Sequence, residues 1–267
     1  MILFYNPHTT GDTLELDAQE SRHMVRVLRM RAGDRVQLVD GVGGWYEAVI
    51  EDAHPGHCRL KLLSRTTGPD PLPYSLHIAI SPTKSADRFE WFLEKATEIG
   101  ITEITPLLCH RTERTRFNAD RMERVIISAM KQSLKACKPD LHEPATLTDF
   151  ISVDRPGTRG IAHCVFTNRG ISGRPDNSAT TDDSATTDDP ATTDDSAGRI
   201  HITELARHGS YTMLVGPEGD FTAEEVHAAM DAGYTSFHLG ESRLRTETAG
   251  VYICAAISLL SASNPHG

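Results

Sequence analysis

Short runs of apolar and β-branched residues dominate the first 70 positions of the chain. Arg35 to Val39, Trp45 to Ile50 and Cys58 to Leu63 have the composition that favours strands. Between the first two runs, Asp40-Gly41-Val42-Gly43-Gly44 supplies the glycines of a hairpin turn. Glu20 to Met30 instead has the apolar spacing of a short helix. This part of the chain predicts a small β-rich domain with one helix.

Beyond a proline-rich linker at Thr66 to Pro73, the pattern changes to alternating strands and helices. The expected strands are Leu76 to Ile80, Ile104 to Leu108, Ile161 to Phe166 and Tyr211 to Val215. The expected helices are Asp87 to Ile99, Asn118 to Cys137 and Thr222 to Ala232, with capping boxes at Asp87/Glu90 and Thr222/Glu225. This alternation predicts an α/β domain at residues 74–263, with a mostly parallel sheet covered on both faces.

Residues 171–199 interrupt this alternation. They contain Ser-Ala-Thr-Thr-Asp-Asp twice and then Pro-Ala-Thr-Thr-Asp-Asp, which together form an acidic repeat with few apolar side chains. Such a segment cannot bury enough apolar surface to offset the entropy of ordering it. The repeat therefore predicts a disordered surface insertion within the α/β domain.

The composition is that of a globular protein without a membrane span. Of the 267 residues, 39% are hydrophobic and 24% are charged. The most apolar segment, Ala249 to Leu260, predicts a buried helix and is shorter than the roughly 20 residues that a membrane helix needs. The N-terminus has no secretory pattern. Because the five cysteines are scattered and form no Cys-x-x-Cys pair, we expect reduced thiols, no metal and a cytoplasmic location.

The net charge of −10 is distributed unevenly. Residues 176–195 hold seven aspartates and no lysine or arginine, so −10 less −7 leaves −3 for the remainder. Residues 110–138 carry eight lysines and arginines against three acids, and residues 20–35 carry five arginines against two acids. Either cluster alone is better explained by a solvated helix face. Two clusters in one chain also fit a surface that binds nucleic-acid phosphates.

Two loops have the composition of a binding site. Leu214-Val215-Gly216-Pro217-Glu218-Gly219-Asp220-Phe221 joins an apolar strand to a helix through a glycine-containing turn. Leu239-Gly240-Glu241-Ser242-Arg243-Leu244-Arg245-Thr246-Glu247-Thr248-Ala249 places charges and hydroxyls directly after another strand. The sequence contains neither a P-loop nor a Gly-x-Gly-x-x-Gly pattern, so a P-loop or Rossmann dinucleotide site has no support.

These loops and three further motifs, in the same order along the chain, resemble the RsmE family. The further motifs are His23-Met24-Val25-Arg26-Val27-Leu28-Arg29, Lys95-Ala96-Thr97-Glu98-Ile99-Gly100-Ile101 and Ala129-Met130-Lys131-Gln132-Ser133. Members of this family are SPOUT-class methyltransferases that use S-adenosylmethionine to modify a uridine of small-subunit ribosomal RNA. The resemblance covers nearly the whole chain outside residues 171–200.

The resemblance implies a PUA-like RNA-binding β-barrel at residues 1–70 and a SPOUT domain, with a trefoil-knotted and mostly parallel sheet, at residues 74–263. It also implies a homodimer that packs around Ala249 to Leu260. The implied reaction is methylation of N3 of one uridine in 16S ribosomal RNA, with either free RNA or the assembled small subunit as substrate. A non-catalytic RNA-binding assembly factor and a SPOUT methyltransferase of transfer RNA are the alternatives.

The resemblance further assigns candidate site residues. S-adenosylmethionine is expected to contact Leu214, Val215, Gly216, Pro217, Glu218, Gly219, Leu239, Gly240, Leu244, Arg245, Thr246, Thr248 and Ala249. RNA is expected to contact Arg22, His23, Arg26, Arg29, Lys84, Arg111, Arg114, Lys131, Gln132 and Lys135.

Three residues are candidates for the chemistry. Arg245, followed by Arg243, is expected to stabilise the uridinate that develops as the methyl group arrives, although a surface ion pair with Glu241 or Glu247 competes with this role. Glu247 is a candidate base if burial raises its pKa, but it could equally accept hydrogen bonds from backbone N–H groups. Glu218 has the same two interpretations.

Overall fold

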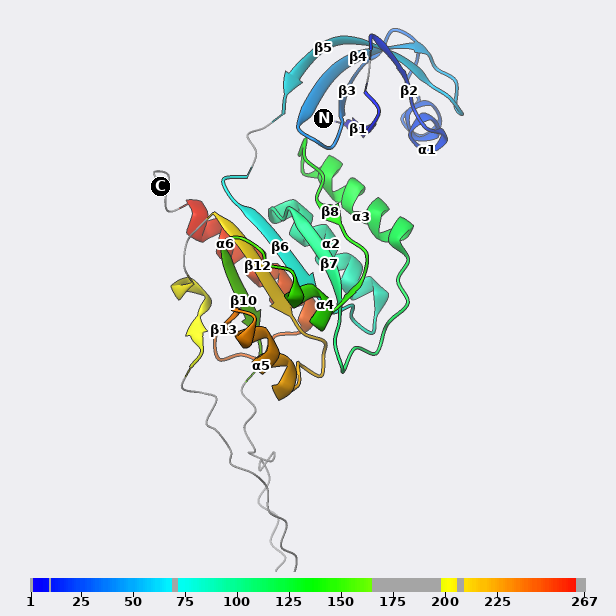
Figure 1. The fold of residues 1–267 in the computed structure, drawn as a ribbon. Helices are drawn as coiled ribbons and strands as arrows, with labels where there is room; N and C mark the ends of the chain where they lie inside the picture. Colours follow the sequence, from blue (N-terminus) through cyan, green and yellow to red (C-terminus); the bar gives the residue numbers. More distant parts are fainter. Residues whose placement is uncertain (1, 10, 69–71, 165–197, 206–208, 263–267) are drawn as a thin grey trace, which may run out of the picture.

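The N-terminal part of the chain forms a curved five-stranded sheet (Figure 1). The computed structural model describes residues 2–9, 11–68, 72–164, 198–205 and 209–262, and the expected insertion at 171–199 lies outside them except for its last two residues. The strands follow the order β1-β3-β4-β5-β2 and comprise β1 Leu3–Tyr5, β2 Thr13–Glu15, β3 Arg35–Val39, β4 Gly44–Asp52 and β5 Arg59–Thr67. The predicted β3–β4 hairpin is confirmed by its antiparallel pairing. The predicted linker begins later than Thr66, because Thr66 still pairs with Trp45 in the sheet.

The helix of this sheet is shorter than predicted. Helix α1, Ala18–Arg22, is capped by the Asp17 side chain and continues as a π-helical turn, His23–Val27. The chain leaves the helix at Leu28, and Arg29 adopts a positive φ of 57°. Arg29 is therefore not on the helix, contrary to the predicted span of Glu20 to Met30. Within this wider π turn the Met24 side chain is fully buried, whereas those of Val25 and Leu28 are only partly buried.

A second sheet forms the centre of the C-terminal part, and the strand pairs found among its described residues are all parallel. The order is β11-β13-β10-β12-β6-β7-β8, and β9 pairs with β7. The strands are β6 Ser75–Ile80, β7 Glu103–Leu108, β8 Asp140–Leu141, β9 Ala145–Thr146, β10 Thr158–Ala162, β11 Ile200–His201, β12 Ser210–Val215 and β13 Thr235–His238. Strand β10 ends at Ala162, earlier than the predicted Phe166. The predicted mostly parallel sheet is confirmed.

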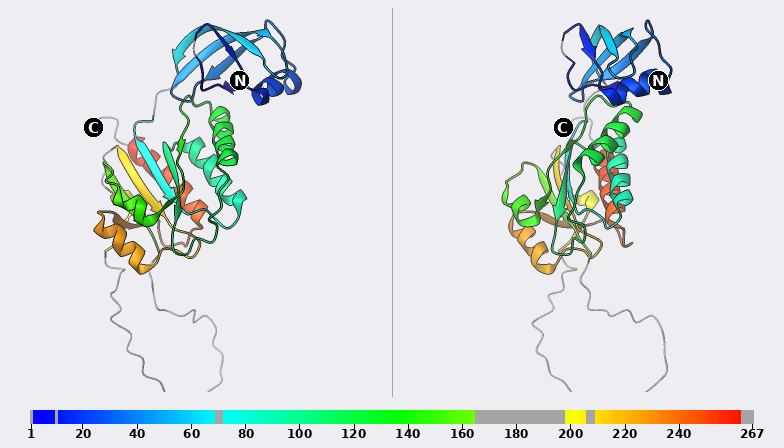
Figure 2. Two further views of the ribbon diagram at one scale, coloured as in Figure 1. Left: turned by 45° about the vertical axis from the view of Figure 1, so that its right-hand side comes forward. Right: turned by 90° about the vertical axis from the view of Figure 1, so that its right-hand side faces the viewer.

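Helices cover both faces of this sheet (Figure 2). One face carries α2 Ala86–Ile99, α3 Ala119–Gln132 and α6 Thr246–Ala262, and the other carries α4 Leu147–Ser152 and α5 Ala223–Asp231. A short 3-10 turn, Ile202–Glu204, follows β11. Because side chains alternate along a strand, Ile78 and Ile80 enter the core under α2 and α6, whereas Ala79 packs under α4 and α5. Among the described residues, no helix is both long and apolar enough to span a bilayer.

Three helix ends test the sequence signals directly. Thr222 and Glu225 form the predicted capping box of α5. The capping box predicted for α2 is wrong, because Ser85 occupies the N-cap position and Glu90 instead pairs with Arg121, whose Nε lies 2.6 Å from its Oε1. Helix α3 ends at Gln132 rather than at Cys137, because the chain turns there and Leu134 has a positive φ.

The N-terminal sheet rests on the C-terminal end of α3 (Figures 1 and 2). A small apolar cluster joins them and comprises Leu3, Val39, Met130 and Ala136. Backbone bonds reinforce the contact, because Gly43 N–H donates to Ala136 O and Lys138 N–H donates to Gly41 O. The Lys131 ammonium also lies 2.5 Å from the largely buried Glu20 carboxylate. The segment after α3 is therefore a structural junction between the two sheets.

Candidate active site

The two polar loops of the sequence meet in one cavity of about 800 Å³. One loop follows β12 and begins at Gly216, and the other follows β13 and begins at Leu239. A third wall comes from Ala162, the last residue of β10, and from His163 and Cys164 after it; β10 is the strand between β12 and β13. All three segments leave the carboxyl ends of neighbouring parallel strands, which is the edge where open α/β sheets bind ligands.

Buried contacts hold the two loops together. The Thr246 hydroxyl, at the start of α6, donates to Gly216 O at 3.1 Å, and both residues are buried. A Cβ on Gly216 would lie 3.0 Å from the Phe221 ring, so this turn has no room for a larger residue. Gly240 differs, because a Cβ there would meet no atom within 4 Å but its φ of 111° is one that other residues rarely adopt. Glycine is thus required for space at one loop and for conformation at the other.

Most of the residues predicted to contact S-adenosylmethionine line this cavity. They are Val215, Gly216, Pro217, Glu218, Gly219, Leu239, Gly240, Leu244, Arg245, Thr246 and Ala249. Leu214 does not, because alternation along β12 turns its side chain into the core under α4 and α5. Thr248 is also absent from the lining. The contact predicted for Leu214 therefore has no basis as a side-chain contact.

The sequence reasoning missed part of the wall, which includes Ala162, His163, Cys164, Arg199, Asp220, Phe237 and His238. Cys164 N–H donates to the Asp220 carboxylate at 2.7 Å, which ties the segment after β10 to the loop after β12. Partial burial, followed by the nearby Asp220 charge, raises the pKa of the Cys164 thiol. Arg199 donates to His163 O at 2.6 Å. No local signal marked His163 and Cys164, because β10 was expected to continue through them.

The three candidate catalytic residues occupy different environments. Arg243 and Arg245 are exposed and line the cavity. Among the described residues neither arginine forms an ion pair, so the surface ion pairs considered with Glu241 and Glu247 are not found. Arg243 instead lies 3.5 Å from Glu218 O. Glu247 is only 6% exposed, lies outside the cavity lining and has its carboxylate 3.8 Å from the Arg88 guanidinium.

Glu218 differs from Glu247 both in its exposure and in its position relative to the cavity. It is exposed, and it lines the cavity. Its carboxylate accepts a hydrogen bond from the backbone N–H of Lys84 at 2.9 Å. The structural interpretation of this residue, as an acceptor of a backbone N–H group, is therefore confirmed.

The predicted RNA-binding residues divide into engaged and unengaged side chains. Arg111 donates to Gly219 O at 2.7 Å and so supports a cavity loop. Lys131 is paired with Glu20, and the ion pair with Glu113 raises the pKa of Lys84. Arg114 makes one contact, in which its Nε lies 3.3 Å from the Arg116 carbonyl oxygen. Gln132 is exposed. Burial lowers the pKa of Lys135.

The remaining predicted RNA-binding residues belong to the N-terminal part of the chain, in and just after helix α1. Arg22, Arg26 and Arg29 are exposed, and none forms an ion pair with a described acid, while His23 between them is half-buried beside the Phe4 ring. Helix α1, which ends at Arg22 and leads to the other two, lies at the end of the molecule opposite β13 and α5, whose loops border the cavity (Figures 1 and 2). A single chain therefore presents these three arginines and its cavity on different parts of its surface, whereas Arg243 and Arg245 line the cavity itself.

Comparison with known families identifies the class of this protein. The RNA methyltransferase domain matches residues 70–258, and the RNA methyltransferase PUA domain matches residues 16–63. The chain belongs to this family of RNA methyltransferases. Curated relatives of one kind, named ribosomal RNA small subunit methyltransferase E, confirm the resemblance to the RsmE family. That from Synechocystis is 26% identical over 93% of this chain and 73% of its own length, and that from Mycobacterium tuberculosis is 27% identical over 94% and 88%.

Solved structures agree over the full length. A probable rRNA-methyltransferase from Porphyromonas gingivalis is 37% identical, with a TM-score of 0.80 over 98% of this chain and 99% of the other. A ribosomal RNA small subunit methyltransferase E from Neisseria gonorrhoeae, bound to S-adenosyl methionine, is 25% identical, with a TM-score of 0.77 over 97% and 98%. These matches confirm the predicted PUA-like and SPOUT fold class.

Proposed function

We propose that this chain transfers the methyl group of S-adenosylmethionine to N3 of a uridine in small-subunit ribosomal RNA. The observation that carries the proposal is the convergence of two glycine-containing loops on one cavity at the carboxyl ends of β12 and β13. A volume of about 800 Å³ lies within the range of about 300–1,000 Å³ that is typical of small-molecule sites. The relative from Neisseria gonorrhoeae holds S-adenosyl methionine, which supports the same cofactor here.

The cavity walls fit this cofactor chemically. Val215, Leu239 and Leu244 supply apolar surface for an adenine ring, and the loops at Gly216 and Gly240 expose backbone groups that can bond its polar edge and ribose. Bound there, S-adenosylmethionine supplies an electrophilic methyl group on a sulfonium. The protein needs no covalent intermediate and acts by holding the two reactants in line.

The protein must also help the acceptor lose a proton. A bond forms between N3 and the methyl carbon, the carbon–sulfur bond breaks with its electron pair left on sulfur, and the N3 proton passes to a base. We assign Arg245, supported by Arg243, to the negative charge that develops on the uracil, because both guanidinium groups line the cavity and neither is paired with a described acid. Glu218 is better placed than Glu247 to accept the proton, because only Glu218 lines the cavity.

We propose Arg22, Arg26 and Arg29 as the main phosphate contacts, since they are exposed and unpaired among the described residues.

We further propose that the protein acts as a homodimer in the cytoplasm. Helix α6 leaves Tyr252 42% and Leu259 70% exposed within one chain, although the segment is apolar almost all round. A second copy packed on this face would complete its burial. The trefoil knot remains an expectation from the family.

One experiment tests the activity. The purified chain is incubated with S-adenosylmethionine and, separately, with 16S ribosomal RNA, assembled small subunits and transfer RNA, and the digested nucleosides are analysed by mass spectrometry. N3-methyluridine in a ribosomal sample supports the proposal and identifies the preferred substrate. The same product only in transfer RNA supports the transfer-RNA enzyme. Cofactor binding without a methylated nucleoside in any sample overturns the proposed reaction in favour of a non-catalytic assembly factor.

A further inference from the structure

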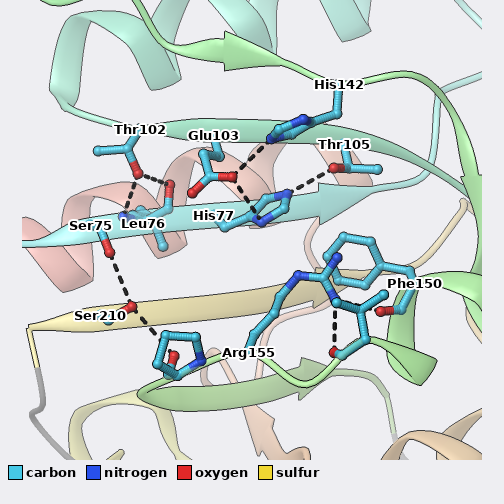
Figure 3. A network of polar contacts seen from close by, with 12 residues as sticks. Ser75, Leu76, His77, Thr102, Glu103, Thr105, His142, Phe150, Arg155 and Ser210 are labelled. Carbon is cyan, nitrogen blue, oxygen red and sulfur yellow. Dashed lines mark hydrogen bonds and ion pairs between the residues drawn. The ribbon is translucent and has the colours of Figure 1, made fainter.

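A cluster of two histidines and a glutamate lies away from the cavity, on the face of the sheet that carries α4 (Figure 3). His77 lies in the first half of β6, Glu103 begins β7, and His142 follows β8. Their imidazole nitrogens and carboxylate oxygen all lie within 4.8 Å of one another. His77 is buried, whereas Glu103 and His142 are partly exposed, with side-chain exposures of 41% and 44%.

The backbone holds the three residues in place. His77 and Glu103 are directly paired across β6 and β7, and His142 N–H donates to Ile104 O. Two neighbouring strands and the segment directly after β8 thus each supply one side chain. A site built on strands keeps its geometry more precisely than one built on loops, because the hydrogen-bonded sheet fixes the Cα positions.

The contacts within the cluster have the spacing of metal ligands. His142 Nε2 lies 2.9 Å and His77 Nδ1 lies 3.6 Å from the same oxygen, Glu103 Oε2. Ligands about 2.1 Å from a tetrahedral zinc ion lie about 3.4 Å from one another, so only small side-chain movements are needed. The 3.6 Å distance between His77 Nδ1 and Glu103 Oε2 is too long for a hydrogen bond, so these two atoms share no proton.

The surroundings orient His77 as a ligand. Its other ring nitrogen, Nε2, lies 2.8 Å from the Thr105 hydroxyl, and the Phe150 ring packs edge-on against the imidazole. Metal-binding histidines usually have such a hydrogen-bond partner on the second nitrogen, because it sets the tautomer and the direction of the ring.

We propose that His77, Glu103 and His142 bind a Zn²⁺ ion, with water from the exposed side as the fourth ligand. The ion would cross-link β6, β7 and the segment after β8, and so stabilise the sheet near its edge. The scattered cysteines gave no reason to expect a metal, because they lie elsewhere and the sequence does not bring these three residues together. The neighbouring Arg155 guanidinium is a positive charge beside the cluster, so zinc should bind less tightly than at a similar site without a cation.

Zinc binding to the full-length protein tests the proposal. The chain is treated with a chelator, dialysed, and titrated with Zn²⁺ by calorimetry and by competition with a chromophoric chelator. We expect one equivalent to bind to the wild-type protein and to raise its Tm. His142→Ala and Glu103→Gln should each weaken this binding by about 100-fold or more and abolish the rise in Tm. Thr105→Val should weaken it by about 10- to 100-fold.

A matched surface variant controls for non-specific binding. His57 is exposed and stacks on His54 with ring centroids 3.7 Å apart, so His57→Ala removes a histidine from a pair outside the cluster. It should bind zinc like the wild type. Equal zinc affinity in the wild type and in His142→Ala would overturn the proposal. A loss of zinc affinity in His57→Ala as large as that in His142→Ala would also overturn it. Because His142 and Glu103 are partly exposed, their variants should fold, which the Tm without zinc verifies. The readouts do not depend on methyl transfer, so the outcome is independent of the proposed function.

Discussion

The hydrogen bond between Thr246 and Gly216 O is a direct test of how the cavity is built. It joins the first residue of α6 to the loop after β12, over 3.1 Å, with both groups buried. Thr246→Val keeps the β-branched shape and removes only the hydroxyl, so the Gly216 carbonyl loses its partner without a large cavity being formed.

The expected magnitude follows from this geometry. Loss of a neutral hydrogen bond that leaves a buried carbonyl unsatisfied destabilises a protein by about 1–3 kcal/mol. If the bond mainly holds the two loops in their binding arrangement, the same free energy appears as a loss of cofactor affinity of about 5- to 150-fold. If it mainly stabilises the fold, it appears as a fall in Tm of about 2–4 °C per kcal/mol.

Calorimetric titration with S-adenosylmethionine measures the effect on cofactor affinity, and thermal unfolding without the cofactor measures the effect on stability. We expect Thr246→Val to weaken cofactor binding and Thr246→Ser, which keeps the hydroxyl, to bind within about threefold of the wild type. A lower Tm with unchanged affinity would show that the contact supports the fold and not the cavity. Unchanged values of both would refute the reasoning, because the bond would then contribute nothing measurable.

Four further predictions follow from the same structure. Gly240→Val should weaken cofactor binding while preserving the fold, because its φ of 111° disfavours a β-branched residue although no atom would meet the new Cβ; unchanged affinity in calorimetry would place the pocket elsewhere. Arg245→Ala should lower kcat by about 100-fold with RNA and cofactor affinities preserved; a wild-type rate would remove it from the reaction. Arg26→Ala should reduce the slope of log RNA affinity against log salt by about one, with cofactor affinity unchanged, and an unaltered slope would exclude it as a phosphate contact. Iodoacetamide at pH 8 should label the exposed Cys137 well before Cys58, whose pKa burial raises to about 11, since little of the latter is thiolate; mass spectrometry showing equal rates would contradict the buried placement.

The sequence by itself indicated most of the longer strands and helices and the two loops that carry the candidate site, but not the short strands β1, β2, β8, β9 and β11 or helix α4. The strong signals were local: the hairpin at β3 and β4, the capping box at Thr222 and Glu225, and the glycine-containing turn after β12 each depend on neighbouring residues. Such signals persist because backbone conformation is set mainly by near neighbours. Family motifs then indicated the cofactor, the fold class and the target RNA.

The tertiary structure decided which of these residues act together. It turned Leu214 into the core, paired Lys131 with Glu20 at the junction of the two sheets, and placed Glu247 outside the cavity. It also brought His163 and Cys164 into the cavity wall and grouped His77 of β6, Glu103 of β7 and His142 after β8. Sequence separation hides such groupings, because the pairing order of parallel strands, and not their order along the chain, sets which side chains become neighbours.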